Sequence, residues 1–403
     1  MNASAFTGGR SLMTRAAGIG VLGLGLTAVG AALDTRRALF AYLTAYAFWV
    51  GIAAAALVFL MANEASGARW YVVVRRLLET IPAALAVLAV LFLPIALGMR
   101  QLYPWVDPSV HAAATPAGHG QAALAAHLWE HRHPWLNVPF FLLRAVLYLL
   151  VLLGVAALLR GWSLKQDGSG DPELTLKMRR LAAGGLPFVA LAITFAAVDW
   201  QMSLSAFVFS TIFGVYWFSG SLVAAIGVLI IAVWAASREE PLKGALNANH
   251  VHSLGKYLLA FTAFWAYIAF SQYLLMWIAN LPEEVPWYLV RTDSGWKGVG
   301  VFLVLFQFVL PFLVLLSRPL KRRLAPLVVM SVWVVAVHYV DIYWVVMPPL
   351  SPEGPRPSWM DLAALAGVGG VAVAFVVSRL RGHPLVPARD PYLDESLRYE
   401  PLQ

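Results

Sequence analysis

Apolar runs of about 20 residues recur along the whole chain, and this feature most limits what it can fold into. Each run is long enough to cross the hydrocarbon core of a bilayer as an α-helix. Only 12% of the 403 residues are charged, about half the share expected for a soluble domain. The runs do not alternate polar and apolar residues, as the strands of a membrane β-barrel do. The sequence therefore predicts an all-α, polytopic integral membrane protein.

Hydropathy windows of about 19 residues predict the positions of about ten transmembrane helices. These helices lie near residues 16–33, 39–62, 77–98, 137–159, 183–200, 205–236, 252–280, 298–316, 325–347 and 359–380. Residues 39–200 contain the second to fifth of these spans, and residues 201–350 contain the sixth to ninth. A first helix with its N-terminal segment (1–38) and a last helix with its tail (351–403) flank them. Because no small-residue cleavage site precedes Asp34, we expect the first helix to be uncleaved rather than a signal peptide.

Lysine and arginine residues divide unevenly between the two sides of these spans. Of the 29, 21 lie on the side that holds both termini, 7 lie on the other side, and Arg144 lies inside a span. Basic residues are retained on the cytoplasmic side of a membrane, so both termini are predicted to be cytoplasmic. This distribution also explains the net charge of +8 better than nucleic-acid binding does.

The chain contains no cysteine, which excludes disulfides, thiolate-ligated iron–sulfur clusters and covalently attached c-type haem. Histidines gather in one predicted outer loop, at His111, His119, His127, His131 and His133. His127 and His131 are four residues apart, as metal ligands on a helix can be. Without an obvious third ligand, no metal site is expected.

Charged side chains at membrane depth cost free energy, so each one is expected to have a partner or a function. The candidates gather on the predicted outer side, at Arg144, Asp199, Glu283, Glu284, His338 and Asp341. The i,i+3 spacing of His338 and Asp341 places them side by side on a helix. Two interpretations stay open: Arg144 pairs with a carboxylate to hold helices together, or these groups form a proton-conducting chain or the polar end of a quinone pocket. One histidine inside a span does not provide two axial ligands for haem b.

The seventh span contains further polar residues. Gln272, Tyr273 and Asn280 lie in AFWAYIAFSQYLLMWIANLPEEVPWYL, and we expect them to face the bundle interior because lipid disfavours amides. At the cytoplasmic end of this span, His252 and Lys256 share one helical face. They are interpreted either as interfacial groups or as the mouth of a proton path.

Several strings of the sequence resemble one known family. They are WLNVPFFLLRAVLY (135–148), VDWQMSL (198–204), STIFGVYWF (210–218), HVHSLGKYLLAFTAFWAYIAFSQYLLMWIANLPEE (250–284) and the tail HPLVPARDPYLDESLRYE (383–400). They are similar to the F subunit, or quinone-binding subunit 2, of bacterial alternative complex III. That subunit is related to the polysulfide reductase membrane subunit family.

The resemblance implies a subunit of a quinol:electron-acceptor oxidoreductase in the bacterial inner membrane. It also implies two four-helix bundles, in residues 39–200 and 201–350. It implies that this chain has no redox centre of its own, scaffolds the complex and contributes a proton path. The implied partners are a similar C membrane subunit, an iron–sulfur B subunit, a multihaem A and a mono-haem E cytochrome, small membrane subunits, lipids and the quinone pool. Within the matched strings, Arg144, Asp199, Glu283 and Glu284 are the residues it points to for the proton path.

Two alternatives remain. The chain could bind quinone directly, with His338, Asp341 and Trp344 at the ring. It could also be a secondary transporter, which requires broken helices at matching positions of two halves. The glycine-rich first span and the glycines at 367, 369 and 370 do not form such a pair convincingly.

Overall fold

The structure of the protein is a computed structural model that describes residues 5–107, 119–282 and 284–400. The described part is helical throughout and contains no strand. Ten of its helical segments are long and apolar enough to cross a membrane. The prediction of an all-α, polytopic membrane protein is therefore confirmed.

The membrane-length segments are α1 (Arg10–Leu33), α2 (Thr35–Ala65), α9 (Val138–Ser169), α10 (Pro172–Trp200), α11 (Phe213–Ala236), α13 (Ala248–Ala279), α18 (Leu324–Val346) and α19 (Trp359–Leu380). Two further spans are irregular. The third consists of α3 (Val72–Thr80), η1 (Ile81–Ala84), α4 (Leu85–Val90) and α5 (Leu93–Leu97), and the eighth of α15 (Trp296–Leu303), the π-helical η4 (Val304–Val309) and α16 (Leu310–Leu316). Shorter elements are α6 (Met99–Leu102), α8 (His119–Arg132), η3 (Met202–Leu204), α12 (Leu242–Ala245), α14 (Val285–Thr292), α17 (Arg318–Lys321) and α20 (Leu393–Leu397).

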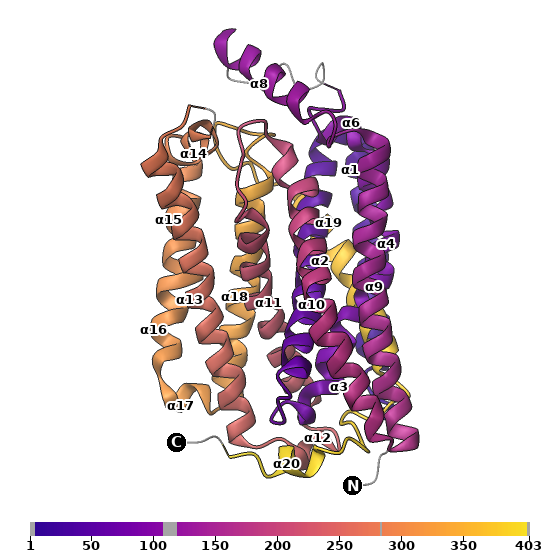
Figure 1. Ribbon diagram of the computed structural model, residues 1–403. Coiled ribbons are helices and arrows are strands. Elements are labelled where there is room, and N and C mark those ends of the chain that lie inside the picture. The colour runs from indigo at the N-terminus through magenta and orange to yellow at the C-terminus, as the bar shows by residue number, and fades with distance from the viewer. Residues whose placement is uncertain (1–4, 108–118, 283, 401–403) are drawn as a thin grey trace.

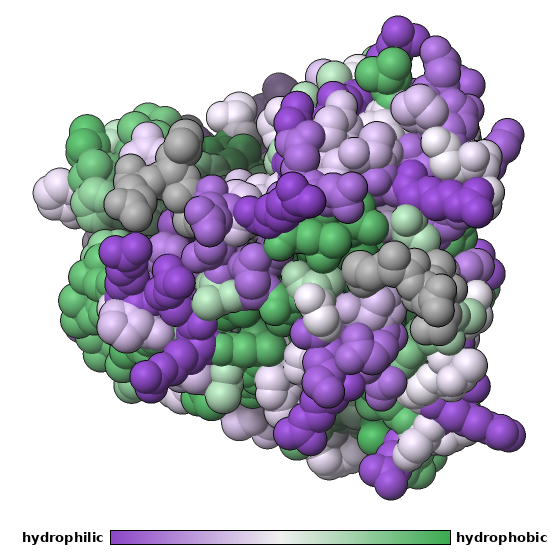
Figure 2. Space-filling model, turned by 90° about the horizontal axis from the view of Figure 1, so that it is seen from below, coloured by the Kyte–Doolittle hydropathy of each residue, from purple (hydrophilic) through white to green (hydrophobic). Residues whose placement is uncertain are grey.

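The spans run between two ends of the molecule (Figure 1). The segments next to both termini lie at one end, together with α12, α17 and α20, and we call this the tail end. We call the opposite end, which holds α6, α8 and α14, the α8 end. Hydrophilic side chains gather over the tail end (Figure 2). That the tail end faces the cytoplasm stays a prediction.

Several helix boundaries differ from the expected spans, among them the ends of α1 and α9, and two cases have a clear structural cause. α11 begins at Phe213 rather than at 205, because residues 205–212 form a loop and a turn. The side chain of Arg132 holds this loop through the main-chain oxygen of Ala206, at 2.7 Å. α10 begins at Pro172 rather than at 183, and the side chain of Asp171 caps its N-terminus. Its first turns are too basic to appear in a hydropathy window.

α2 lies at the centre of the molecule. It packs against α3, α4 and α10 and also against α11, α18 and α19. Of its most apolar window, 83% is buried, as expected for a helix that is apolar on every face. α11 in turn packs on α13 and α18, and α13 packs on α16. We call α2, α3, α4, α5, α9 and α10 the first group of helices, and α11, α13, α15, α16 and α18 the second group. α2 thus also contacts helices of the second group.

α1 and α19 are unbroken and pack closely through glycines. A Cβ atom added to Gly23 would lie 2.4 Å from the main-chain nitrogen of Gly367, and one added to Gly370 would lie 2.5 Å from that of Gly20. Small residues let two membrane helices approach at backbone distance, which replaces the hydrophobic effect that lipid does not provide. These two helices form a peripheral pair beside α2.

Candidate functional site

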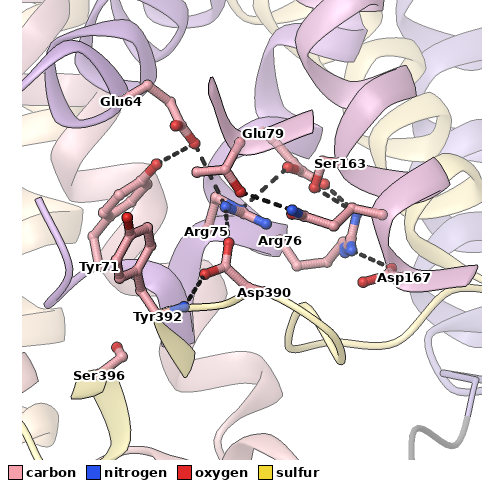
Figure 3. Close-up of polar contacts among 12 residues, drawn as sticks. Glu64, Tyr71, Arg75, Arg76, Glu79, Ser163, Asp167, Asp390, Tyr392 and Ser396 are labelled. Carbon is pink, nitrogen blue, oxygen red and sulfur yellow. Dashed lines mark hydrogen bonds and ion pairs between the residues drawn. The ribbon is translucent and has the colours of Figure 1, made fainter. Parts of the chain in front are cut away.

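A network of buried charges lies at the tail end (Figure 3). Its members, which we call the tail-end network, are Glu64 of α2, Arg75, Arg76 and Glu79 of α3, Asp167 of α9 and Asp390 of the C-terminal tail. Arg75 forms ion pairs with Asp390, with Glu64 at 3.6 Å and with Glu79 at 3.9 Å. Arg76 forms ion pairs with Glu79 and Asp167. Two adjacent arginines therefore organise carboxylates from four separate segments.

The charges of the tail-end network do not balance. Four carboxylates face two guanidinium groups, and every one of these side chains is at most 13% exposed. Arg160, which is also buried, makes no ion pair with them, and its Nη2 donates to the main-chain oxygen of Arg379. Burial of unpaired negative charge is costly. The network thus contains more carboxylates than guanidinium groups, and the buried Arg160 acts on Glu79 from nearby without an ion pair.

The C-terminal tail covers the network. The main-chain nitrogen of Ala388 donates to Asp167 at 3.0 Å. Two residues further on, Asp390 accepts a hydrogen bond from Arg75. Further along, the Ser396 hydroxyl donates to the main-chain oxygen of Trp70 at 3.0 Å. The tail thus bridges α3 and the α9–α10 connection, and it closes the network from the surface.

Sequence reasoning missed this network. Arg75 and Arg76 look like ordinary basic residues at the cytoplasmic end of a span, and they were counted as such for the orientation. They are 2% and 0% exposed. The signal that could have revealed them is the carboxylate Glu79 three and four residues further on, together with Glu64 near the end of the preceding span.

At the α8 end of the first group of helices, Asp199 of α10 is fully enclosed. Arg144 of α9 contacts both carboxylate oxygens, at 2.8 and 2.9 Å. The hydroxyl of Tyr148 donates to Asp199 at 2.9 Å and the indole of Trp135 at 3.0 Å. The guanidinium also lies over the Trp135 ring, 4.1 Å from its centroid. The predicted pairing of Arg144 with a carboxylate is thus present, and it is a closed ion pair between two helices.

In the second group of helices, His338 and Asp341 of α18 lie side by side as expected, with 3.4 Å between Nδ1 and Oδ2. Asp341 accepts hydrogen bonds from the Tyr216 hydroxyl and from the Trp265 indole, the latter at 3.1 Å. The other ring nitrogen of His338 lies 3.3 Å from the Ser221 hydroxyl. Among the described residues, no lysine or arginine pairs with Asp341. Nδ1 of His338 itself has no hydrogen-bond partner among the described residues. The result is a buried row of polar groups in which His338 and Asp341 face each other without a hydrogen bond.

A glycine makes this contact between α11 and α18 possible. A Cβ atom on Gly220 would lie 2.8 Å from the His338 ring and 3.0 Å from Oδ2 of Asp341. Any side chain at this position would therefore push the histidine away from its carboxylate.

Two buried amides lie in the same group of helices. Gln272 of α13 is 3% exposed and its Oε1 has no hydrogen-bond partner. Gln307, in the π-helical η4, is 1% exposed and neither of its amide atoms is hydrogen-bonded. In η4 the carbonyl of Phe306 accepts a hydrogen bond from the Trp333 indole at 2.9 Å. Unpaired buried amides are typical positions for internal water.

The expectation that Tyr273 and Asn280 face the bundle interior is wrong. Tyr273 is 40% exposed and lies against the ring of Tyr288. Asn280 is exposed and ends α13 in the left-handed conformation, with φ of 47°, which asparagine tolerates better than most residues. Glu284 is half-buried at the start of α14, and Glu283 lies outside the described residues.

The remaining candidates lie apart from His338. His252 is half-buried and Lys256 exposed, both at the tail end of α13. Trp344 packs against the ring of Trp287 and near the guanidinium of Arg291 at the α8 end. A groove of about 490 Å³ opens there, lined in part by Trp129, Phe207, Trp287 and Arg291. His338, Asp341 and Trp344 do not line it.

Within the described residues, no three histidine, aspartate or glutamate side chains are grouped as a metal site. In α8, the rings of His127 and His131 lie 4.3 Å apart between centroids, and His131 contacts the main-chain oxygen of His127. His111 and the side chain of His119 lie outside the described part of the chain.

The fold and these clusters define a multi-pass helical membrane protein with buried titratable groups at both ends. In comparisons with known proteins, no family model matches the chain and no curated protein matches it significantly.

Proposed function

We propose that this chain is a membrane subunit of a bacterial quinol:electron-acceptor oxidoreductase, that it contributes a proton path, and that it helps to hold the complex together. The resemblance of five sequence strings to the F subunit of alternative complex III supports this proposal. The ten membrane-length helices are consistent with it. Haems and iron–sulfur clusters would belong to the partner subunits, and both termini would face the cytoplasm.

The observation that carries the proton path is the pair formed by His338 and Asp341. A histidine beside a carboxylate and a hydroxyl can accept a proton on one side of its ring and release one on the other. Among the described residues no lysine or arginine pairs with Asp341, and in this proposal the relay passes a proton between Asp341 and His338, whose facing atoms lie 3.4 Å apart. The Tyr216 hydroxyl and the Ser221 hydroxyl extend this chain in two directions.

The tail-end network supplies the other end of the path. Its excess of carboxylates over guanidinium groups makes it a site where a proton can be taken up and held. α2 links the two clusters, because Phe48 packs against the ring of His338 while Glu64 belongs to the network. These two residues are sixteen positions apart, or about 24 Å along the helix. Internal water would bridge this interval in the proposed path.

Asp199 has a structural role in this proposal. Its two oxygens accept four hydrogen bonds, two of them from Arg144. Two of these donors, Arg144 and Tyr148, belong to α9, so the carboxylate joins α9 to α10. We therefore assign Arg144 and Asp199 to the scaffold rather than to the relay.

The experiment is a comparison of Asp341→Asn with Asp199→Asn in the whole complex, reconstituted in liposomes. The readout is the number of protons translocated per electron, measured beside the amount of assembled complex. We expect Asp341→Asn to lower the proton-to-electron ratio in an assembled complex, and Asp199→Asn to lower assembly. An exposed carboxylate at the α8 end, changed in Glu353→Gln, serves as the control. An unchanged ratio in assembled Asp341→Asn complex contradicts the relay.

Direct quinone binding by His338, Asp341 and Trp344 has less support. The first two side chains are 0% and 1% exposed, and the groove at the α8 end is lined by other residues.

A further inference from the structure

A second cluster of charged residues lies at the tail end, between α13 and α17. His252 and Lys256 belong to α13, Arg318 and Lys321 to α17, and Arg322 follows directly. The charged groups that act most strongly on the His252 ring are Lys256, Lys321, Arg322 and Arg318, and all of them are cationic. We call these five residues the basic site.

The basic site contains no counter-charge. Among the described residues, no ion pair joins any of its members to a carboxylate. This distinguishes it from the tail-end network, where every arginine faces at least two carboxylates. A group of like charges without a partner repels itself, and an anion relieves that repulsion.

Two members are held in place beneath the surface. Lys321 is only 7% exposed, and α17 lies so close to α13 that a Cβ atom on Gly255 would lie 2.8 Å from Cβ of Lys321. Nδ1 of His252 is buried and has no hydrogen-bond partner. Burial and the nearby Lys256 lower the pKa of Lys321. Keeping a buried cation and an unpaired ring nitrogen in this position costs free energy unless an anion binds to them.

The position of the basic site indicates what such a ligand is. α17 directly follows α16, whose Leu313 and Leu316 are 60% and 53% exposed on the membrane-facing surface. In Figure 2, hydrophilic side chains on the left, where α17 and the start of α13 lie, border directly on the hydrophobic side of the molecule. A ligand here would have a phosphate at the level of the cations and acyl chains against the leucines.

We propose that the basic site binds the phosphate group of an anionic phospholipid in the leaflet at the tail end. Lys256 and Arg318, which are exposed, contact the phosphate from the two helices. Lys321 lies behind them and adds positive charge, and His252 adds the hydrogen-bonding atom Nδ1, which has no partner among the described residues. The site is independent of the proton path, since it shares no residue with the tail-end network or with the pair of His338 and Asp341.

The test measures lipid binding to the full-length chain in detergent, by native mass spectrometry. Phosphatidylglycerol is titrated against phosphatidylcholine with the same acyl chains. We expect the unchanged chain to prefer phosphatidylglycerol, and the double variant Lys256→Gln/Arg318→Gln to lose affinity about fivefold for each charge removed. The matched control is Arg238→Gln/Lys243→Gln, two exposed cations at the same end, in a segment that also carries Glu239 and Glu240.

Three results would overturn the proposal. The first is equal binding of the two lipids by the unchanged chain. The second is an equal loss of phosphatidylglycerol in the basic-site variant and in the control variant. The third concerns the source of the phosphate: millimolar inorganic phosphate that displaces the lipid completely identifies a soluble anion as the ligand. Thermal unfolding of each variant shows whether the comparison is made between folded proteins.

Discussion

Nδ1 of His338 lies 3.4 Å from Oδ2 of Asp341, on adjacent turns of one helix and without a cation as partner. Arg144 and Asp199 form the contrasting case, since they come from two helices and join through two hydrogen bonds of 2.8 and 2.9 Å. Both pairs lie toward the α8 end and both are buried. The members of the first pair face each other without a hydrogen bond, whereas those of the second join two opposite charges. In the proposed function, the first pair is the relay and the second is a structural tie.

Removal of one partner of the structural tie should be more harmful than removal of both. We expect Arg144→Met to lower the free energy of unfolding by about 3–5 kcal/mol, because it leaves the Asp199 carboxylate buried and unpaired. The double variant Arg144→Met/Asp199→Leu should recover most of this loss. Thermal unfolding in detergent measures both effects. A double variant that is less stable than Arg144→Met would contradict this account of the pair.

The close packing of α1 on α19 predicts a contrast between two nearby glycines. In Gly23→Ala the new methyl group would meet the main chain of Gly367 at 2.4 Å, and we expect a loss of about 1–3 kcal/mol from overpacking. Gly25 has nothing within 4 Å of its added Cβ, so Gly25→Ala should be neutral or slightly stabilising. Thermal unfolding of the two variants distinguishes them. Similar stabilities would show that α1 does not rest on α19 as described.

The helices could be predicted from the sequence because each span exceeds the length that a bilayer requires. Their ends could not. The hydropathy of 205–212 is high enough to continue α11, yet those residues form the segment that Arg132 binds. The third and eighth spans look regular in sequence, but Pro82 lies in a 3-10 turn and Phe306 in a π-helical turn. Neither the hydrogen bonds of Arg132 nor these local changes in helix type alter the average hydropathy of a sequence window.

The candidate site, too, could be predicted from the sequence only in part. His338 and Asp341 could be found because their spacing and depth are local properties of one helix. Arg75 could not, since its partner Asp390 lies 315 positions away in the sequence. A basic residue at the end of a span normally indicates orientation, and only the folded tail turns this one into a buried ion pair. Tyr273 was misjudged because a helical wheel does not show which face the neighbouring helices cover.

The tail should detach more readily when its buried carboxylate is removed. In Asp390→Asn, Arg75 loses its ion pair to the tail, and we expect faster hydrogen exchange and proteolysis in residues 385–400. Glu395→Gln is the matched control, since its ion pair with Arg69 is half-exposed and such pairs contribute at most about 1 kcal/mol. Hydrogen exchange with mass spectrometry measures both variants. Equal protection in the two would mean that the network does not anchor the tail.

The tail should also loosen in mild acid. Burial, and then the cations Arg160, Arg76 and Arg379, lower the pKa of His383 below its ordinary value of 6.5. Below pH 6.5 the histidine of the unfolded or detached tail takes up a proton that the folded tail disfavours, so stability falls as the pH drops toward the lowered pKa.

In His383→Gln this contribution is absent, and we expect the protection of residues 385–400 between pH 7 and about 5 to depend less on pH than in the unchanged chain. His127→Gln, in the exposed part of α8, should leave the pH dependence as it is. Hydrogen exchange of the tail, corrected for the intrinsic pH dependence of exchange, provides the measurement. An unchanged pH dependence in His383→Gln would assign the loosening to another titrating group.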